Sequence, residues 1–191
     1  MKILITGGCG FIGSTLVKLF ANSNKNSVLN IDKLTYAANQ SNLADIEGHK
    51  SYSFIQVDIC DKSALSNIFK EFKPEIVYHL AAESHVDRSI DKPSAFIETN
   101  ITGTYNLLEA SLAFYKTLTP DQKKKFRFVH VSTDEVFGSL QTDDSAFNRH
   151  SSYKPRSPYS ASKASSDHLA KSWFHTYGLP TIISNCSNNY G

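Results

Sequence analysis

The chain has no excess of charge of either sign. Its 191 residues include 20 Lys or Arg and 18 Asp or Glu, which gives a formal net charge of +2. Proteins that bind nucleic acid usually carry a basic patch or stripe, and the densest basic run here is residues 123–125. We expect that run to be a solvated join between a loop and a strand, and we expect no nucleic-acid partner.

Cysteine and long apolar segments are also scarce. Cys9, Cys60 and Cys186 are odd in number and form no C-x-x-C pair, so they suggest neither a disulfide framework nor a metal site. No apolar run approaches the roughly 18 residues of a membrane helix, and residues 1–5 lack the charged-then-apolar pattern of a leader. We therefore expect a cytoplasmic protein with no metal and no membrane contact.

The remaining composition is that of an ordinary globular domain. Hydrophobic residues make up 40% and charged residues 20% of the chain, and no internal repeat or low-complexity tract is visible. A chain of this length buries roughly 70% of its unfolded surface, so it needs no disulfide or metal to stabilise a core. We expect residues 1–191 to form one domain.

Short apolar runs rich in β-branched residues alternate with longer helical patterns. The runs predict strands at 3–6, 27–31, 54–57, 76–79, 128–131 and 181–184. The periodic segments between them predict helices at 11–22, 61–72, 93–115 and 157–177. This alternation is typical of the α/β class, and it predicts a doubly wound parallel sheet with helices on both faces.

Two polar connections, 33–50 and 138–156, are longer than a minimal sheet of this kind needs. Both follow predicted strands, and such sheets bind ligands beyond the carboxyl ends of their strands. The chain itself ends in what reads as the loop after a strand, at residues 185–191. We expect a longer protein with a substrate-binding lobe beyond residue 191, and a native end at that residue is the less favoured alternative.

A glycine-rich turn joins the first predicted strand to the first predicted helix. Gly7, Gly10 and Gly13 follow the pattern G-x-x-G-x-x-G, which lets backbone amides approach a pyrophosphate at the positive end of a helix. Asp32 ends the second predicted strand, about 20 residues after the last glycine, where a carboxylate accepts hydrogen bonds from the adenosine ribose. This spacing predicts a Rossmann-type site for NAD. NADP is less favoured because the carboxylate would repel its 2′-phosphate, although Lys33 is adjacent.

Other interpretations of these acidic positions stay open. Asp32 is also explained as a turn residue at the end of a strand. Asp58 and Ile59 end the third predicted strand, within reach of an adenine, but an N-terminal contact to the helix at 61–72 explains Asp58 nearly as well.

Tyr159 and Lys163 are four residues apart in a predicted helix, so their side chains share one face. A free tyrosine has a pKa of about 10. We expect the ammonium of Lys163, with the positive nicotinamide of an oxidised cofactor, to lower that pKa and make Tyr159 a usable base. Taken alone, a Y-x-x-x-K pattern also describes a surface pair.

A hydroxyl and two neighbouring carboxylates follow the predicted strand 128–131. They belong to Thr133, Asp134 and Glu135. Paired carboxylates suit a reaction that needs both an acid and a base, if their surroundings separate their pKa values. A capping threonine with two solvated acids is the alternative interpretation.

With these motifs in place, the chain resembles the extended short-chain dehydrogenases/reductases of the NAD-dependent epimerase/dehydratase family. Segments 6–13, 79–89, 132–138, 159–163 and 185–191 carry the resemblance and span almost the whole chain. The Thr-Asp-Glu triplet is the specific mark, since it resembles the branch of 4,6-dehydratases that acts on dTDP-glucose, whereas the related epimerases typically lack the Asp-Glu pair.

The resemblance implies a role for each reacting group. Tyr159 would take the proton of the glucose 4-hydroxyl as hydride passes to NAD, and Lys163 would hold the cofactor ribose and lower the tyrosine pKa. Glu135 would remove the proton at carbon 5, and Asp134 would protonate the departing 6-hydroxyl, before hydride returns to carbon 6. Thr133 would bond to the oxygen at carbon 4.

The resemblance also implies binding residues and partners. Beyond the glycines, the NAD contacts would be Phe11, Ile12, Asp32, Lys33, Leu34, Thr35, Asp58, Ile59, Leu80, Ala81, Ala82, Ser84, Thr99, Tyr159, Lys163 and Asn189. Ser84, Thr133 and Asn188 would contact the nucleotide sugar. The helices at 93–115 and 157–177 would form a homodimer contact. Two alternatives remain, a 4-epimerase or dehydratase of another nucleotide sugar and a non-catalytic NAD-binding sensor.

Overall fold

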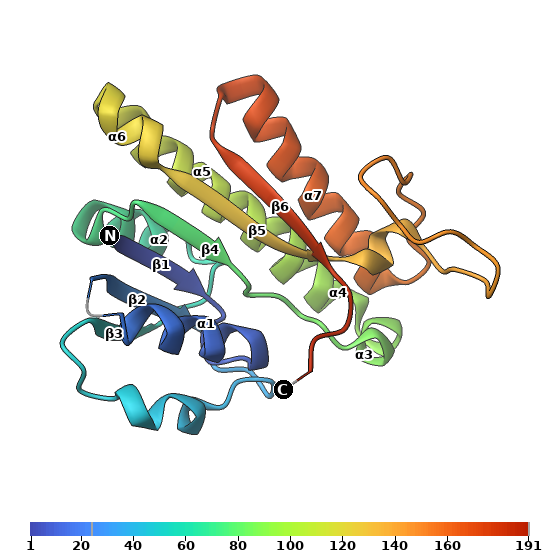
Figure 1. The fold of residues 1–191 in the computed structure, drawn as a ribbon, viewed down its shortest axis with the longest axis horizontal. Coiled ribbons are helices and arrows are strands. Elements are labelled where there is room, and N and C mark those ends of the chain that lie inside the picture. The colour runs from blue at the N-terminus through green and yellow to red at the C-terminus, as the bar shows by residue number, and fades with distance from the viewer. Residues whose placement is uncertain (24, 191) are drawn as a thin grey trace.

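The computed structural model describes residues 1–23 and 25–190. It confirms the predicted α/β class, with one sheet of six parallel strands in the order β3-β2-β1-β4-β5-β6 (Figure 1). The strands are β1 (Lys2–Thr6), β2 (Ser27–Asp32), β3 (Tyr52–Gln56), β4 (Ile76–His79), β5 (Arg127–Thr133) and β6 (Thr181–Cys186). Each of the six predicted strands is found, within a few residues of its expected bounds.

Helices connect these strands. They are α1 (Phe11–Ala21), α2 (Lys62–Phe72), α3 (Val86–Asp91), α4 (Pro93–Phe96), α5 (Thr104–Thr117), α6 (Pro120–Lys125) and α7 (Pro158–Tyr177), with 3₁₀ helices η1 (Gln40–Ile46) and η3 (Asp134–Phe137) and a π-helix η2 (Ile97–Gly103). The predicted helix at 93–115 is therefore helical but not uniform, because the π-helix η2 separates α4 from α5.

Local sequence signals set the ends of the helices. The Asp61 carboxylate accepts a hydrogen bond from the Ala64 amide at 3.0 Å and so caps the start of α2. Ser157 caps α7 in the same way through the Ser160 amide, at 3.0 Å. Helix α7 ends at Gly178, whose φ of 69° is the left-handed conformation that glycine adopts without strain.

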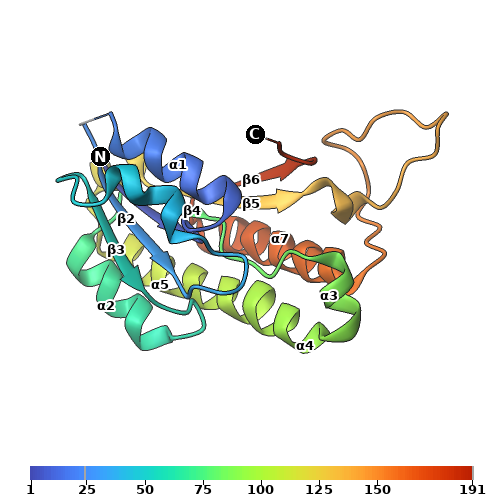
Figure 2. The ribbon, with the colours of Figure 1, turned by 90° about the horizontal axis from the view of Figure 1, so that it is seen from below.

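The two faces of the sheet pack against different helices, as the turned view in Figure 2 shows. Alternate residues of β1 point to opposite faces, so Leu4 belongs to one core and Ile3 and Ile5 belong to the other. The core around Leu4 includes residues of α2, α5 and α7, whereas the core around Ile3 and Ile5 includes residues of α1 and η1. The first half of the sheet is thus enclosed on both faces.

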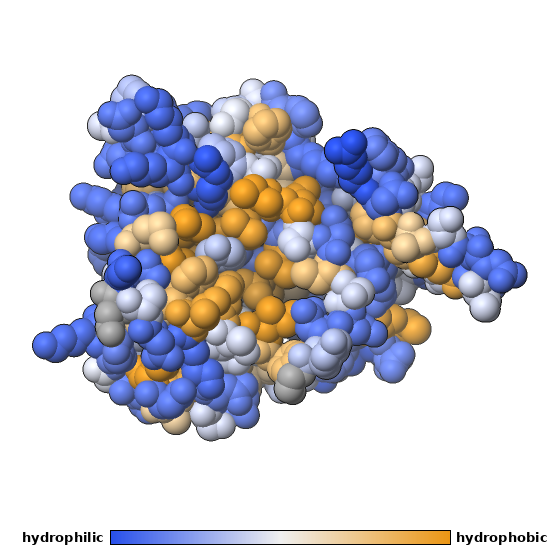
Figure 3. All heavy atoms as spheres, in the orientation of Figure 1, coloured by the Kyte–Doolittle hydropathy of each residue, from blue (hydrophilic) through white to orange (hydrophobic). Residues whose placement is uncertain are grey.

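The half of the sheet nearest β6 is covered differently. The register places Ile5, Tyr78, Val129 and Ile182 in one row on the α1 side of the sheet. Ile5 is fully buried, but Ile182, at the far end of the row, is 48% exposed. Figure 3 shows a band of hydrophobic surface across the middle of this face. Within the described residues, helices therefore cover both faces at β1 but only the α7 face at β6.

Phe128 on β5 is fully buried in the core beneath α5 and α7. Because Phe128→Ala leaves a cavity that its neighbours cannot close, we expect it to lower the free energy of unfolding by about 3–5 kcal/mol. Leu19→Ala is the matched control, since Leu19 is 65% exposed, and it should change stability by less than about 0.5 kcal/mol. Urea unfolding measures both values, and equal effects would contradict this account of the core.

Two expectations about the connections are wrong. Residues 123–125 are not a join between loop and strand but the last turn of α6, because Thr119 and Gln122 form a reciprocal capping box ahead of them. The segment 33–50 is not loop throughout, since Leu43 and Ile46 bury themselves beside α1 and fold η1. The segment 138–156, in contrast, contains no helix or strand.

All six strands are parallel, so their carboxyl ends meet at one edge of the sheet. The glycine turn after β1, the loops after β2 and β4, and η3 after β5 all begin at this edge. Parallel sheets of this order bind ligands at the point where the strand order reverses, which here lies between β1 and β4. The fold therefore gathers the predicted functional segments in one place.

Candidate active site

A cleft with a volume of about 420 Å³ lies at this edge of the sheet. Its walls come from the glycine turn, the ends of β2, β4 and β5 with their loops, and α7. The predicted cofactor residues that line it are Gly7, Gly10, Phe11, Ile12, Gly13, Asp32, Lys33, Thr35, Ile59, Leu80, Ala81, Ala82, Ser84, Thr99, Tyr159 and Lys163. The structure thus brings most of them together around one space, and their contact with a cofactor remains a prediction.

The glycine turn is packed too closely for side chains. Gly7 has a φ of +74°, and a Cβ there would lie 2.6 Å from the Ala81 amide nitrogen. A Cβ on Gly13 would collide with the carbonyl oxygen of Gly7. Helix α1 begins directly after Gly10, which supplies no side-chain cap to its first amides. The turn therefore presents bare backbone and a helix N-terminus to the cleft, as an anion site requires.

Asp32 is held rigidly at the end of β2. One carboxylate oxygen accepts a hydrogen bond from the Cys9 amide at 3.0 Å, and the other accepts from the Leu34 amide at 2.8 Å. The residue is only 9% exposed, and it faces the cleft. Asp32 thus links the glycine turn to the loop after β2 and keeps a negative charge at a fixed place in the cleft wall.

Lys33 crosses from the end of β2 to two neighbouring segments. Its amine donates to the Thr99 hydroxyl at 3.1 Å and lies 3.6 Å from a carboxylate oxygen of Asp58. Asp58 also accepts a hydrogen bond from the Cys60 amide, at 2.9 Å. In the structure the Asp58 carboxylate pairs with Lys33, and Asp58 does not line the cleft. The contact of Asp58 with an adenine stays a prediction.

Tyr159 and Lys163 both line the cleft from α7. Lys163 is 5% exposed, and its amine donates to the carbonyl oxygen of Val131 at 2.8 Å. Burial lowers the pKa of Lys163 to about 8, although the Asp167 carboxylate acts in the opposite direction. The lysine is thus mostly protonated at neutral pH but is close to its titration range.

The expected lowering of the Tyr159 pKa is not found in the chain by itself. Burial, followed by the charge of Glu135, raises the pKa of Tyr159 to about 12, and the Thr133 hydroxyl only partly offsets this. The Lys163 ammonium, which donates to the Val131 carbonyl, is not among the groups that lower the Tyr159 pKa. The expectation counted the Lys163 ammonium but left out desolvation and the two carboxylates on η3.

The Thr-Asp-Glu triplet lies where β5 passes into η3. Thr133 caps η3, since its hydroxyl accepts from the Glu135 amide at 3.2 Å and donates to an Asp134 carboxylate oxygen at 3.4 Å. Burial, with the charge of Asp134, raises the pKa of the Glu135 carboxyl. The capping role of Thr133 is therefore confirmed, and the charges of Asp134 and Glu135 both act to raise the Tyr159 pKa. The chemical role of the triplet stays a prediction.

Several predicted residues are not among those that line the cleft, namely Leu34, Asp58, Thr133, Asp134, Glu135, Asn188 and Asn189. The triplet follows Ser132, which does line it. Leu34 is in the turn after β2, with a φ of 61°, and packs against the core beside α1. Asn188 and Asn189 are exposed in the last loop, where the Asn189 amide donates to the Ser187 carbonyl at 3.1 Å. Gly191, the end of the last resembling segment, lies outside the described residues. The ligand contacts proposed for these positions stay predictions.

Two buried polar residues near the cleft, Asn100 and His79, were given no role from the sequence, although His79 begins the resembling segment 79–89. Asn100 in η2 pairs with both backbone groups of Glu83, at 2.8 and 2.9 Å, and donates to Ser162 beside Lys163 at 2.9 Å. His79 joins Thr6, just before the glycine turn, to Thr104 on α5, at 2.8 and 2.9 Å. A polar residue at an apolar position of a periodic pattern was the only signal for these contacts.

A sheet in this order, with a glycine turn at the reversal of strand order and a Tyr–Lys pair in the cleft, defines a Rossmann-type dinucleotide-binding protein. The chain belongs to the GDP-mannose 4,6 dehydratase family, whose pattern matches residues 4–191. Within the described residues, no helix is long and apolar enough to cross a membrane.

Individual relatives agree with this placement. The chain is 57% identical over its whole length to a dTDP-glucose 4,6-dehydratase of Shigella flexneri, of which it covers 55%. A crystal structure of a dTDP-glucose 4,6-dehydratase from Streptomyces venezuelae, with NAD bound, superposes with a TM-score of 0.87 and 41% identity over the whole chain and 57% of that structure. A Thermus thermophilus UDP-glucose 4-epimerase in complex with NAD has a TM-score of 0.82 and 30% identity, over 97% of this chain and 54% of the other. The chain thus spans about half the length of the curated relatives it matches.

Proposed function

We propose that the protein is a 4,6-dehydratase that converts dTDP-glucose to the 4-keto-6-deoxy sugar with bound NAD. The observation that carries the proposal is that Asp134 and Glu135, in η3 after β5, lie next to the helix α7 that carries Tyr159 and Lys163. The charges of both acids are felt at the phenol. The similarity to the dTDP-glucose 4,6-dehydratases supports the choice of sugar nucleotide.

The residues of the cleft fit NAD. At Gly7 and Gly13 the glycine turn is packed against neighbouring backbone too closely for any Cβ, and the first amides of α1 are free of a side-chain cap. Asp32 would accept the adenosine ribose hydroxyls, and Lys163 would hold the second ribose. When bound, NAD would supply a hydride acceptor for carbon 4 and a hydride donor for carbon 6.

The chain's own groups would move the protons. Tyr159 would take the proton of the 4-hydroxyl, and Thr133 would donate a hydrogen bond to the resulting keto oxygen. Glu135 would then take the proton at carbon 5, which the keto group acidifies, and Asp134 would give a proton to the 6-hydroxyl so that it leaves as water. The raised pKa of Glu135 suits a base that works near neutral pH.

The test is incubation of the whole protein with dTDP-glucose, followed by mass spectrometry and nuclear magnetic resonance of the sugar. We expect a product lighter by one water, with a keto group at carbon 4 and a methyl group at carbon 6. An inverted sugar with an intact 6-hydroxyl would instead identify an epimerase. Tight NAD binding without turnover of any nucleotide sugar would identify a sensor.

Asp32→Asn tests the cofactor assignment separately. The loss of a charged acceptor should weaken NAD binding by about 10- to 100-fold. Because Asn would no longer repel the 2′-phosphate of NADP, the difference between the NAD and NADP affinities should also become smaller. Titration calorimetry with each cofactor measures both effects. Asp45→Asn is the control, since Asp45 is 60% exposed and pairs with Lys18 away from the cleft. Equal NAD affinity in the Asp32 variant and wild type would remove Asp32 from the site.

The wider arrangement belongs to the same proposal. Residues 1–191 would hold the cofactor and the reacting groups, with the grip on the nucleotide supplied beyond residue 191. Two copies would associate through α5 and α7, which run side by side over one face of the sheet (Figure 2). The protein would act in the cytoplasm.

A further inference from the structure

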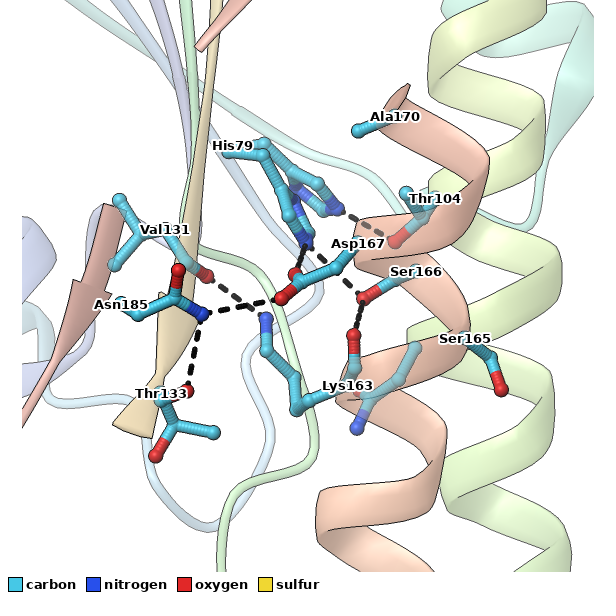
Figure 4. Close-up of polar contacts among 12 residues, drawn as sticks. His79, Thr104, Val131, Thr133, Lys163, Ser165, Ser166, Asp167, Ala170 and Asn185 are labelled. Carbon is cyan, nitrogen blue, oxygen red and sulfur yellow. Dashed lines mark hydrogen bonds and ion pairs between the residues drawn. The ribbon is translucent and has the colours of Figure 1, made fainter. Parts of the chain in front are cut away.

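Asp167 lies in a buried polar cluster behind the cleft, one helical turn beyond Lys163 on α7 (Figure 4). Its side chain is fully buried. One carboxylate oxygen accepts from the Tyr153 hydroxyl at 2.9 Å and from the Asn185 amide at 3.1 Å, and the other lies 3.2 Å from Nε2 of His130. No step of the proposed reaction uses this carboxylate.

The groups around the Asp167 carboxylate are uncharged, except for the Lys163 ammonium. Burial lowers the pKa of His130 to about 4, so that histidine is uncharged at neutral pH and the contact at 3.2 Å is not an ion pair. Burial favours a neutral Asp167, but the nearby His130 imidazole, the Ser132 hydroxyl and the Lys163 charge outweigh it and hold the pKa of Asp167 below its ordinary value. Asp167 is therefore a buried negative charge.

Lys163 is the only Lys or Arg that is buried in the described part of the chain. Its amine makes one hydrogen bond, to the uncharged carbonyl of Val131. A buried ion is costly unless an opposite charge is near. Residues four apart on a helix are neighbours, and the Asp167 carboxylate is the main group that raises the Lys163 pKa against burial.

Contacts from several elements keep the Asp167 carboxylate in place. Asn185 on β6 donates both to Asp167 and to the Thr133 carbonyl, each at 3.1 Å, and so ties the carboxylate to the end of β5. Tyr153, from the long loop before α7, accepts from the exposed Lys171 amine at 2.9 Å. The titratable or charged groups around Asp167 and Lys163 are His79, His130, Tyr153, Tyr159, Lys171, Cys186, and, further off, Asp134 and Glu135.

We propose that Asp167 is a positioning residue of the reaction, whose buried carboxylate balances the buried Lys163 ammonium and keeps that lysine charged beside Tyr159. Without this carboxylate the ammonium would be an uncompensated ion in the protein interior, and it would lose its proton instead. The inference rests on the proposed function, because that function gives the Lys163 charge its use.

Direct titration of Lys163 tests the charge balance without any substrate. The whole protein is made with isotope-labelled lysine, and Lys163→Arg identifies the Lys163 signal in the magnetic resonance spectrum. We expect Lys163 to titrate near 8 in the wild type, as burial and Asp167 together set it. In Asp167→Asn it should titrate about one unit lower or more, since the variant keeps the shape of the side chain and removes its charge.

The pH profile of turnover is the second measurement. The active form needs protonated Lys163, so activity is lost as pH rises through the pKa of that lysine. Because Asp167→Asn lowers this pKa, the alkaline limb should move to lower pH by the same amount, and turnover at pH 8 should fall about tenfold relative to turnover at the optimum. A purely structural role would reduce turnover equally at every pH.

Two variants serve as controls. Asp167→Glu restores the negative charge and should return the Lys163 titration and the alkaline limb towards wild type. Tyr153→Phe removes one hydrogen bond to Asp167 but leaves its charge, so it should not lower the Lys163 pKa. If Asp167→Asn does not fold, Asp167→Ser replaces it, because the smaller side chain leaves space for water.

The outcomes separate the two hypotheses. A Lys163 signal that titrates at the wild-type pH in Asp167→Asn would overturn the role of Asp167, whatever the enzyme does. Absence of turnover in the wild type, together with a shifted Lys163 titration in the variant, would contradict the proposed function and leave the charge pair standing.

Discussion

Replacement of Glu135 by Gln should abolish dehydration and leave the preceding oxidation intact. Gln keeps the size and hydrogen-bonding oxygen of Glu but cannot accept a proton, so carbon 5 keeps its hydrogen. Removal of a general base typically costs about 10²- to 10⁴-fold in rate. Because Gln removes the Glu135 charge, which helps to raise the Tyr159 pKa, proton removal by Tyr159 should not be hindered, and reduced nicotinamide should accumulate when dTDP-glucose is added.

Glu98→Gln is the matched control for this prediction. Glu98 is exposed in η2, and its charge is not among those that act on Tyr159, so the same chemical change there should leave turnover unaffected. The two steps are read separately, oxidation from the nicotinamide absorbance and dehydration from the mass of the product. Wild-type turnover in Glu135→Gln would remove Glu135 from the reaction and, with it, the distinction between a dehydratase and an epimerase.

The sheet was predictable because each strand has a recognisable hydrophobic pattern in its own few residues. Ile3, Leu4 and Ile5 are all fully buried, so no polar residue interrupts the run and the pattern of a strand covered on both faces is plain. Asp61 and Gly178 mark helix ends through interactions with residues close in the sequence. Such signals need no knowledge of the rest of the fold.

The connections were harder to predict, since their structure depends on distant partners. Leu43 and Ile46 lie in a polar stretch of the sequence, and their packing beside α1 is what stabilises η1. The capping box of Thr119 and Gln122 was, in contrast, a local signal that identifies α6 in retrospect.

The candidate site divides in the same way. The glycine turn, the Tyr159–Lys163 spacing and the Thr-Asp-Glu triplet are local patterns, and the fold brings all three to one edge of the sheet. The role of Asp167 could not be predicted from the sequence, because its partners Tyr153, Asn185 and His130 come from a loop and two strands. The raised pKa of Tyr159 depends on burial and on groups from another element, neither of which spacing along one helix reveals.

Gly7→Ala should weaken NAD binding through a steric effect that a second glycine isolates. Gly7 and Gly48 have nearly the same backbone conformation, with φ of +74° and +79°. A Cβ on Gly7 would lie 2.6 Å from the nitrogen and 2.8 Å from the Cα of Ala81, whereas a Cβ on Gly48 would meet nothing within 4 Å. Both variants therefore carry the same strain of a left-handed alanine, and only Gly7→Ala also pushes backbone against backbone in the cleft.

The difference in NAD affinity between the two variants measures the effect of the close contact between Gly7 and Ala81. Overpacking typically costs about 1–3 kcal/mol, and because the loop after β4 lines the cleft, we expect a loss of NAD affinity of about 10- to 100-fold in Gly7→Ala. Gly48→Ala should bind NAD as the wild type does, with only the modest loss of stability that a positive φ imposes. Titration calorimetry gives the affinities and urea unfolding gives the stabilities. If both variants bind NAD equally well, the close approach of Gly7 and Ala81 does not shape the site, and the cofactor must lie elsewhere along the edge of the sheet.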